Sequence, residues 1–254
     1  MPTQLFDGAV NGAAVTWDSS AATGDPVWLA GPGGTAKFTT VNPIHGSSSV
    51  NVANTVGSQI AALSLDVPAG NAEFSMQGYV RASAPATGSL AVCSGVSQNS
   101  GVSVVIAADG SIRLGHWTGT AGTPAPAGSW PTSGAVRVAV SGNTATGWAR
   151  TAVFAGESTT PLWQTSGTIP GITPGDTWTQ AQFGVAYTET PATVTTVQID
   201  SLRVQAGNGT AEAFMPPEGV AGKARRVWVR EPLAWRNINT GRVATANPGT
   251  EIPN

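Results

Sequence analysis

The segment Gly101–Trp117 constrains the fold more than any other part of this chain. Its sequence, GVSVVIAADGSIRLGHW, places two runs of strand-forming residues on either side of Asp109-Gly110, which accepts the positive φ values of a tight hairpin. A two-residue turn there predicts that Val105 faces Leu114. The opposite face also carries apolar residues, namely Val102, Val104, Ile106 and Trp117. Since neither face is polar enough to be solvated, the hairpin is typical of a β-sandwich whose outer side is covered or binds something.

Composition extends this prediction to most of the chain. The 254 residues include 32 Gly and 18 Pro, and no window repeats apolar residues at the spacing of a long amphipathic helix. Roughly a dozen short strands, separated by Gly- and Pro-containing turns, instead predict an all-β sandwich or jelly roll over residues 1–206. Ala14–Trp17 is among these strands, and none is expected between Phe154 and Gln180. The single cysteine, Cys93, excludes an internal disulfide and is expected to be buried.

The last long strand of the sandwich changes its apolar phase. In residues 194–205, Val197 and Ile199 share one face, whereas Leu202 and Val204 share the other. A β-bulge or bend at Asp200 would restore a single inward face and leave the carboxylate free to accept backbone N–H bonds. Calcium binding is the alternative role for Asp200, but one carboxylate does not make a calcium site.

Residues 207–254 differ from the rest in charge and sequence. Residues 1–217 hold 6 Lys and Arg against 11 Asp and Glu, whereas residues 218–254 hold 6 against 3. After a Pro-rich connector, two alternating runs predict a small hairpin followed by an extended docking arm. Six charges among Trp and Pro are few for nucleic acid and favour docking on an acidic protein surface. The predicted interface has Trp anchors and an Arg rim: Arg225, Arg226, Trp228, Arg230, Trp235 and Arg236.

Several motifs together resemble the concanavalin A-like, laminin-G-type jelly roll. They are AKFTTVNPIHGSSSVNVA (36–53), FSMQGYVRAS (74–83), the Asp-Gly hairpin and QIDSLRVQ (198–205). The C-terminal Trp and Arg pattern is similar to that of minor tail proteins of actinobacterial siphophages. The resemblance implies a concanavalin-like jelly-roll β-sandwich with an extended C-terminal tail carrying a small hairpin. It also implies a structural protein of the phage tail, made in the bacterial cytoplasm and assembled with other tail proteins, as a trimer or hexamer.

The sequence offers no reaction centre and no metal site. Retaining glycosidases hold two carboxyl groups about 5–5.5 Å apart, yet the two acidic residues nearest in sequence, Glu212 and Glu218, are six positions apart. The two histidines, His45 and His116, have no Cys or carboxylate at metal-ligand spacing. No G-x-S-x-G or Walker motif occurs. We therefore expect a protein that is not an enzyme and has no catalytic residues, metal or cofactor.

Two alternatives to a purely structural role in the tail stay open. The first is a lectin-like module for cell-wall glycan, since nine tryptophans suit sugar stacking. Trp117 and Trp130 are its candidate glycan-facing residues. The opposing interpretation is that the tryptophans fill the core, loop bases or an interface, notably Trp17, Trp28, Trp148, Trp163 and Trp178. The second alternative is a capsid decoration protein.

The sequence contains no targeting or membrane signal that we recognise. The first residues, MPTQLFDG, lack the basic and apolar regions of a signal peptide. The longest fully apolar run, Val104–Ala108, is far shorter than a membrane span. We therefore expect no membrane span.

Overall fold

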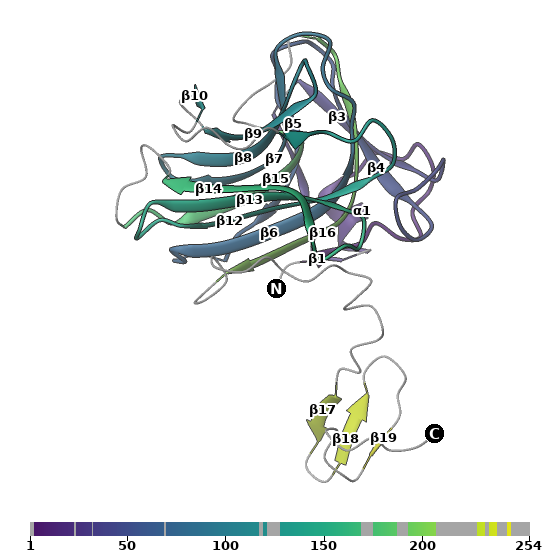
Figure 1. The fold of residues 1–254 in the computed structure, drawn as a ribbon. Coiled ribbons are helices and arrows are strands. Elements are labelled where there is room, and N and C mark those ends of the chain that lie inside the picture. Colours follow the sequence, from purple (N-terminus) through teal and green to yellow (C-terminus); the bar gives the residue numbers. More distant parts are fainter. Residues whose placement is uncertain are drawn as a thin grey trace. The chain divides into compact units, whose positions relative to one another are not determined.

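The computed structural model is almost entirely β and divides into two compact units, residues 1–215 and 216–254. It describes residues 3–22, 24–31, 33–68, 70–116, 119–120, 128–168, 175–186 and 193–206, together with three short strands of the second unit. In the described part of the first unit, two antiparallel sheets of eight strands each form a sandwich (Figure 1). The predicted concanavalin-like jelly-roll class is confirmed.

The first sheet has the strand order β14-β13-β12-β6-β16-β4-β3, and β1 pairs with β16 beside this path. Its strands come from both ends and the middle of the first unit, so the sheet joins segments far apart in the chain (Figure 1). Their bounds are β1 Thr3–Gln4, β3 Gly34–Thr39, β4 Ser49–Asn54, β6 Glu73–Arg81, β12 Val136–Asn143, β13 Trp148–Ala155, β14 Pro161–Thr168 and β16 Thr196–Ala206.

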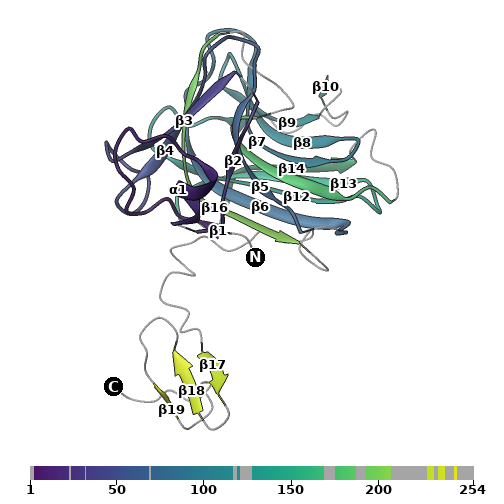
Figure 2. The ribbon, with the colours of Figure 1, turned by 180° about the vertical axis from the view of Figure 1, so that it is seen from behind.

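The second sheet has the order β10-β9-β8-β7-β15-β5-β2, and β11 pairs with β9. It forms the other layer of the sandwich, nearer the viewer when the molecule is turned around (Figure 2). Its bounds are β2 Trp28–Ala30, β5 Ala61–Asp66, β7 Ser89–Ser97, β8 Gly101–Ala107, β9 Ser111–His116, β10 Gly119–Thr120, β11 Gly128–Ser129 and β15 Trp178–Val185.

The core between the sheets depends on two glycines that leave room for two aromatic rings. Phe74 of β6 and Trp178 of β15 lie with ring centroids 4.1 Å apart, and both are fully buried. A Cβ on Gly142 of β12 would lie 2.5 Å from Trp178 Cζ2, and one on Gly95 of β7 would overlap the Phe74 ring. The Trp178 indole N–H donates to the Ala72 carbonyl over 2.8 Å, which fixes the ring. Close packing of this kind is what makes a core sensitive to single added carbons.

The Asp-Gly hairpin forms as β8 and β9, but its predicted register is wrong by one residue. Val104, not Val105, faces Leu114. Gly110 N–H donates to the Ala107 carbonyl over 2.9 Å and Gly110 has φ +81°, so three residues rather than two form the loop. The prediction that neither face is solvated is confirmed: Val104 lies in the main core, and Val105 lies in a separate buried cluster on the other face.

The predicted bulge in the last strand is confirmed. The pairing of β16 with β6 shifts register between Asp200 and Arg203, and Ser201 has φ +50°. As a result Leu202 and Val204 share the core with Val197 and Ile199. Since each strand residue alternates between the two faces, the extra residue restores a single inward face.

Two predictions of local structure are wrong. Trp17 begins helix α1, Trp17–Ala21, instead of ending a strand, because Thr16 and Ser19 form a capping box at its start. Strand β14 was missed, since it begins with Pro161 and is rich in polar residues. Such a sequence is tolerated because β14 is the edge strand of the first sheet.

The second unit contains a three-stranded antiparallel sheet with the order β17-β18-β19. Strands β17 (Trp228–Glu231) and β18 (Ala234–Asn237) form the predicted hairpin. Strand β19 (Val243–Ala244) pairs with β18 and lies in the segment expected to be an extended arm. The two-stranded prediction is therefore incomplete, and the third strand gives the hairpin an additional partner.

Candidate functional site

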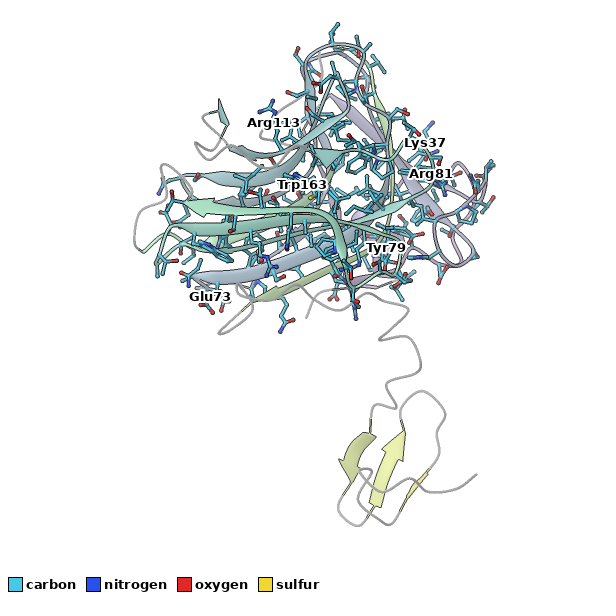
Figure 3. All side chains as sticks on the ribbon, viewed as in Figure 1. Lys37, Glu73, Tyr79, Arg81, Arg113 and Trp163 are labelled. Carbon is cyan, nitrogen blue, oxygen red and sulfur yellow. The ribbon has the colours of Figure 1, made fainter. Side chains whose placement is uncertain are left out.

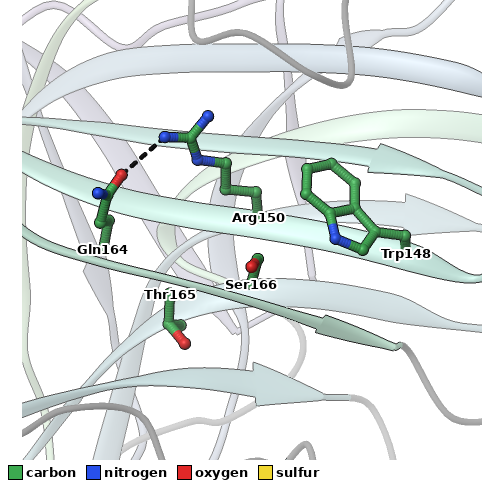
Figure 4. A pocket seen from close by; sticks show the side chains of 5 residues that line it. All are labelled: Trp148, Arg150, Gln164, Thr165 and Ser166. Carbon is green, nitrogen blue, oxygen red and sulfur yellow. Dashed lines mark hydrogen bonds between the residues drawn. The ribbon is translucent and has the colours of Figure 1, made fainter.

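An open hollow of about 460 Å³ lies on the outer face of the first sheet, at the ends of β13 and β14. Its lining residues are Trp148, Arg150, Gln164, Thr165 and Ser166 (Figure 4). The volume is in the range of small-molecule sites, which run from about 300 to 1,000 Å³. The hollow is the candidate functional site of the first unit.

Strand alternation places these side chains. Ala149 and Val153 of β13 belong to the core, so Trp148 and Arg150 project from the opposite face. On β14, Trp163 is buried while Gln164 and Ser166 are exposed. Antiparallel pairing sets Ser166 directly beside Arg150. The site is therefore built on rigid sheet positions.

A hydrogen bond between two lining residues orients part of the polar surface of the hollow. The Arg150 guanidinium donates to Gln164 Oε1 over 2.7 Å (Figure 4). Arg150 is the one ionised side chain among the lining residues, while Gln164, Thr165 and Ser166 contribute neutral donors and acceptors. The half-buried Trp148 stands next to Arg150 and gives the hollow an aromatic wall (Figure 4).

The row of residues that contains Arg150 continues across the sheet. Arg150 pairs with Ser141 of β12, and Ser141 pairs with Ser75 of β6. Within the described structure, the hydroxyls of Ser141 and Ser75 are buried and have no hydrogen-bond partner. Both hydroxyls lie below the surface and are therefore out of reach of a ligand in the hollow.

A second polar cluster surrounds the bulge at Asp200. The buried carboxylate accepts the backbone N–H of His45 over 2.9 Å and of Ser201 over 2.7 Å, and the Ser49 hydroxyl over 2.7 Å. The predicted acceptance of backbone N–H bonds is thus confirmed. Burial raises the pKa of the Asp200 carboxyl to about 6, although the hydrogen bonds from Ser49, His45 and Ser201 oppose this rise.

The same cluster contains a chain of contacts that resembles a hydrolytic triad. Ser201 Oγ lies 3.2 Å from His45 Nδ1, and His45 Nε2 lies 3.3 Å from Glu157 Oε1. However, Ser201 is only 2 % exposed, and His45 also stacks edge-on against Tyr79. A buried hydroxyl is out of reach of a substrate, so these contacts tie the 41–48 loop to the sheet.

The described residues contain no group of three or more His, Cys, Asp or Glu side chains that could hold a metal ion. Cys93 is fully buried, and burial raises the pKa of its thiol to about 12. Helix α1 is five residues long, and no helix in the described ranges has the length and apolar character to cross a membrane.

The predicted glycan-facing residue that the structure describes, Trp130, is not one of the residues that line the hollow. Trp130 is only 6 % exposed and donates its indole N–H to the Ala82 carbonyl over 2.8 Å, so its ring is not available for stacking. The prediction for Trp130 is wrong because the chain after β11 folds back against the end of β6. Trp117 lies outside the described residues.

The predicted C-terminal interface is only partly described. Trp228 and Arg230 are in β17, and Trp235 and Arg236 are in β18, with Arg230 paired opposite Trp235. Arg225 and Arg226 lie outside the described residues. Their role in an interface stays a prediction.

The residue that sequence reasoning missed is Trp148. It was expected in the core with Trp163 and Trp178, which are indeed buried, whereas Trp17 is 51 % exposed. The available signal was the alternation in Trp148-Ala149-Arg150, which puts a tryptophan on the same face as an arginine. The lining residues that β14 contributes could not be identified from the sequence, because β14 was not predicted as a strand.

The fold has relatives among solved structures, although no protein-family model and no curated protein sequence matches the chain. The cellulose-induced protein Cip1 is similar, with a TM-score of 0.52 and 13 % identity over 72 % of this chain and 91 % of Cip1. A Trypanosoma rangeli sialidase matches with a TM-score of 0.47 and 11 % identity, over 82 % of this chain and 31 % of the sialidase. An alginate lyase from Klebsiella pneumoniae matches with a TM-score of 0.40 and 11 % identity, over 69 % and 82 %. The likeness to Cip1 shows a shared β-sandwich fold and carries no activity to this chain.

Proposed function

We propose that the first unit is a glycan-binding, lectin-like module and that the hollow beside β14 is its binding site. The observation that carries the proposal is the half-buried indole of Trp148 in an open hollow otherwise lined by polar side chains. An indole face accepts the C–H surface of a sugar ring, and its amphipathic character suits a partly wet site.

The polar lining supports the same ligand class. Sugar hydroxyls both donate and accept hydrogen bonds, and Gln164 and Ser166 offer both functions from alternate, exposed positions of the edge strand β14. The Arg150 guanidinium adds several N–H donors in one plane, and its hydrogen bond to Gln164 limits its orientation before binding. Such pre-organisation reduces the entropy lost on association.

Binding is tested by affinity electrophoresis and a glycan array with the full-length chain, including bacterial cell-wall polysaccharides. We expect a glycan-dependent mobility shift that Trp148→Ala abolishes and that the matched control Trp17→Ala retains. Trp17 is an exposed tryptophan on helix α1 and is not in the hollow. Circular dichroism melts of both variants verify folding. A Trp148→Ala protein that binds like the parent, or a parent that binds no glycan, contradicts the proposal.

We also propose that the chain serves in a phage virion, as a minor tail protein that presents this module to the host surface. The resemblance of the C-terminal segment supports this role, and so does the division into a sandwich and a separate small unit with its own sheet. Deletion of residues 218–254 should leave a folded sandwich that no longer enters particles. Normal incorporation of the truncated chain would contradict the tail role, and a monomer on sizing would contradict the trimer or hexamer.

A further inference from the structure

Strand β14 is an edge strand with a neighbour on one side only. It ends the strand order of the first sheet and pairs with β13. In an antiparallel sheet, alternate residues of such a strand direct their backbone N–H and C=O groups away from the neighbour. No other strand in the described part of the chain pairs with this side of β14.

The other sheet edges of the described structure are covered or short. At the opposite edge of the first sheet, the chain before α1 covers β3. The Val15 N–H donates to the Ala36 carbonyl over 2.9 Å. The Phe38 N–H donates to the Ala13 carbonyl over 2.9 Å. In the second sheet, the edge strands β2 and β10 have only three and two residues. The eight residues of β14 therefore form the longest uncovered edge among the described strands.

Strand β14 also lacks the charged side chains that commonly keep sheet edges from pairing. Figure 3 labels one residue of each edge of the first sheet, Lys37 on β3 and Trp163 on β14. Lys37 is an exposed charge, whereas the sequence of β14, PLWQTSGT, contains no charged residue. Pro161 lacks an N–H, and the pairing with β13 shifts register beside it, so both protective features lie at one end. Residues 163–168 pair with β13 in regular register and form an uncharged edge.

This edge is held in place by the core behind it. The Trp163 side chain is only 5 % exposed and belongs to the main core. A Cβ on Gly128 of β11 would overlap the Trp163 ring, so the ring packs directly against the second sheet. The backbone of β14 is therefore presented by a closed sandwich, and it needs no rearrangement to accept another strand.

The sequence of β14 is complementary to itself in one antiparallel register, in which two copies meet on a two-fold axis at Thr165. On the face towards the core, Trp163 then lies opposite Gly167, which leaves room for the ring. On the outer face Gln164 lies opposite Ser166, and their amide and hydroxyl groups can form hydrogen bonds. Opposite residues differ by an even number of positions, so the free backbone groups of the two strands meet.

We propose that β14 binds the β14 of a second copy of this chain in this register, so that the two first sheets form one continuous sheet. The contact is isologous, because each copy contributes the same strand. It is compatible with a dimer, or with a hexamer that contains two-fold axes, but not with a trimer. The inference goes beyond the proposed glycan binding and does not depend on it.

The proposed pairing brings the two hollows together on one side of the joined sheet, since the two-fold axis is perpendicular to it. Three strand spacings and an offset of two residues place the two Arg150 Cα atoms about 16 Å apart. Each hollow also gains a neighbour at its edge, because the partner's Ser166 lies opposite Gln164. The assembled protein would thus present two adjacent sites in the same direction.

The experiment measures self-association of the full-length chain by analytical ultracentrifugation over a range of concentrations, without glycan. Gln164→Lys with Ser166→Lys places like charges directly opposite each other at two points of the contact. It should raise the Kd of the two-fold contact about tenfold. Gln164→Lys with Ser166→Glu places opposite charges there and should keep the Kd close to that of the parent. Both positions are exposed, so the sandwich should tolerate these side chains.

The matched control is Thr35→Lys, which adds a lysine at an exposed position of β3, the other edge strand of the first sheet. It should leave association unchanged, and thermal melts of all variants verify folding. A parent that is a monomer or a trimer overturns the inference. So does a folded Lys/Lys variant that associates like the parent, or a Lys/Glu variant that dissociates as readily as Lys/Lys. Association that is lost on deletion of residues 216–254 but not in Lys/Lys also overturns it, because the contact would then lie in the second unit. None of these results bears on glycan binding, which the Trp148→Ala experiment tests separately.

Discussion

Replacing Gly142 by alanine should destabilise the sandwich, although alanine is the better residue for a strand interior. In a strand, alanine is favoured over glycine by roughly 0.5–1 kcal/mol because it loses less backbone entropy. The added Cβ, however, would lie 2.5 Å from Trp178 Cζ2, where ordinary contact begins at 3.4 Å. The indole must therefore move by about 0.9 Å.

The indole has little freedom to make that movement. Its N–H is bonded to the Ala72 carbonyl, and its ring lies against Phe74, which Gly95 accommodates from the other sheet. Over-packing a closed core costs roughly 1–3 kcal/mol. We expect Gly142→Ala to lower the free energy of unfolding by about 1 kcal/mol, which is a mid-range over-packing cost of about 2 kcal/mol less the gain in strand propensity.

The assay is urea unfolding and thermal melting followed by far-UV circular dichroism, in which a loss of this size lowers Tm by about 2–4 °C. Trp178→Phe removes the benzo ring that the Cβ meets, so the double variant should lose less stability than the two single losses combined. A Gly142→Ala protein as stable as the parent, or strictly additive losses, would refute the packing argument.

Three further predictions concern other parts of the chain. Because burial raises the Asp200 pKa to about 6 from 3.8, the folded state binds this proton more tightly. About 3 kcal/mol of stability should therefore be present below pH 4 and lost as pH rises to about 6, and Asp200→Asn should remove that slope in urea titrations. Cys93, whose thiol pKa is about 12, should react with a thiol reagent only after denaturation, and rapid native labelling would disprove its burial. Deleting residues 216–254 should leave the melting curve of the sandwich unchanged, and a large drop in Tm would show that the second unit stabilises the first.

The sequence by itself determined the features that depend on residues close together in the chain. Alternation and turn chemistry identified the all-β class, most strands of both sheets and the Trp228 hairpin. The change of phase around Asp200 was enough to predict a bulge and a carboxylate that accepts backbone N–H bonds, because strand periodicity of two admits few other solutions.

Only the tertiary structure determined which segments, distant in the sequence, lie next to one another. The hollow beside Trp148 depends on β13 pairing with β14, an edge strand whose Pro161 and polar residues carry no strong strand signal. The burial of Trp130 depends on a hydrogen bond to Ala82, 48 residues away in the chain. The first sheet itself likewise brings together strands spread between residues 3 and 206. Strand pairing between distant segments sets these positions, and no local pattern encodes it.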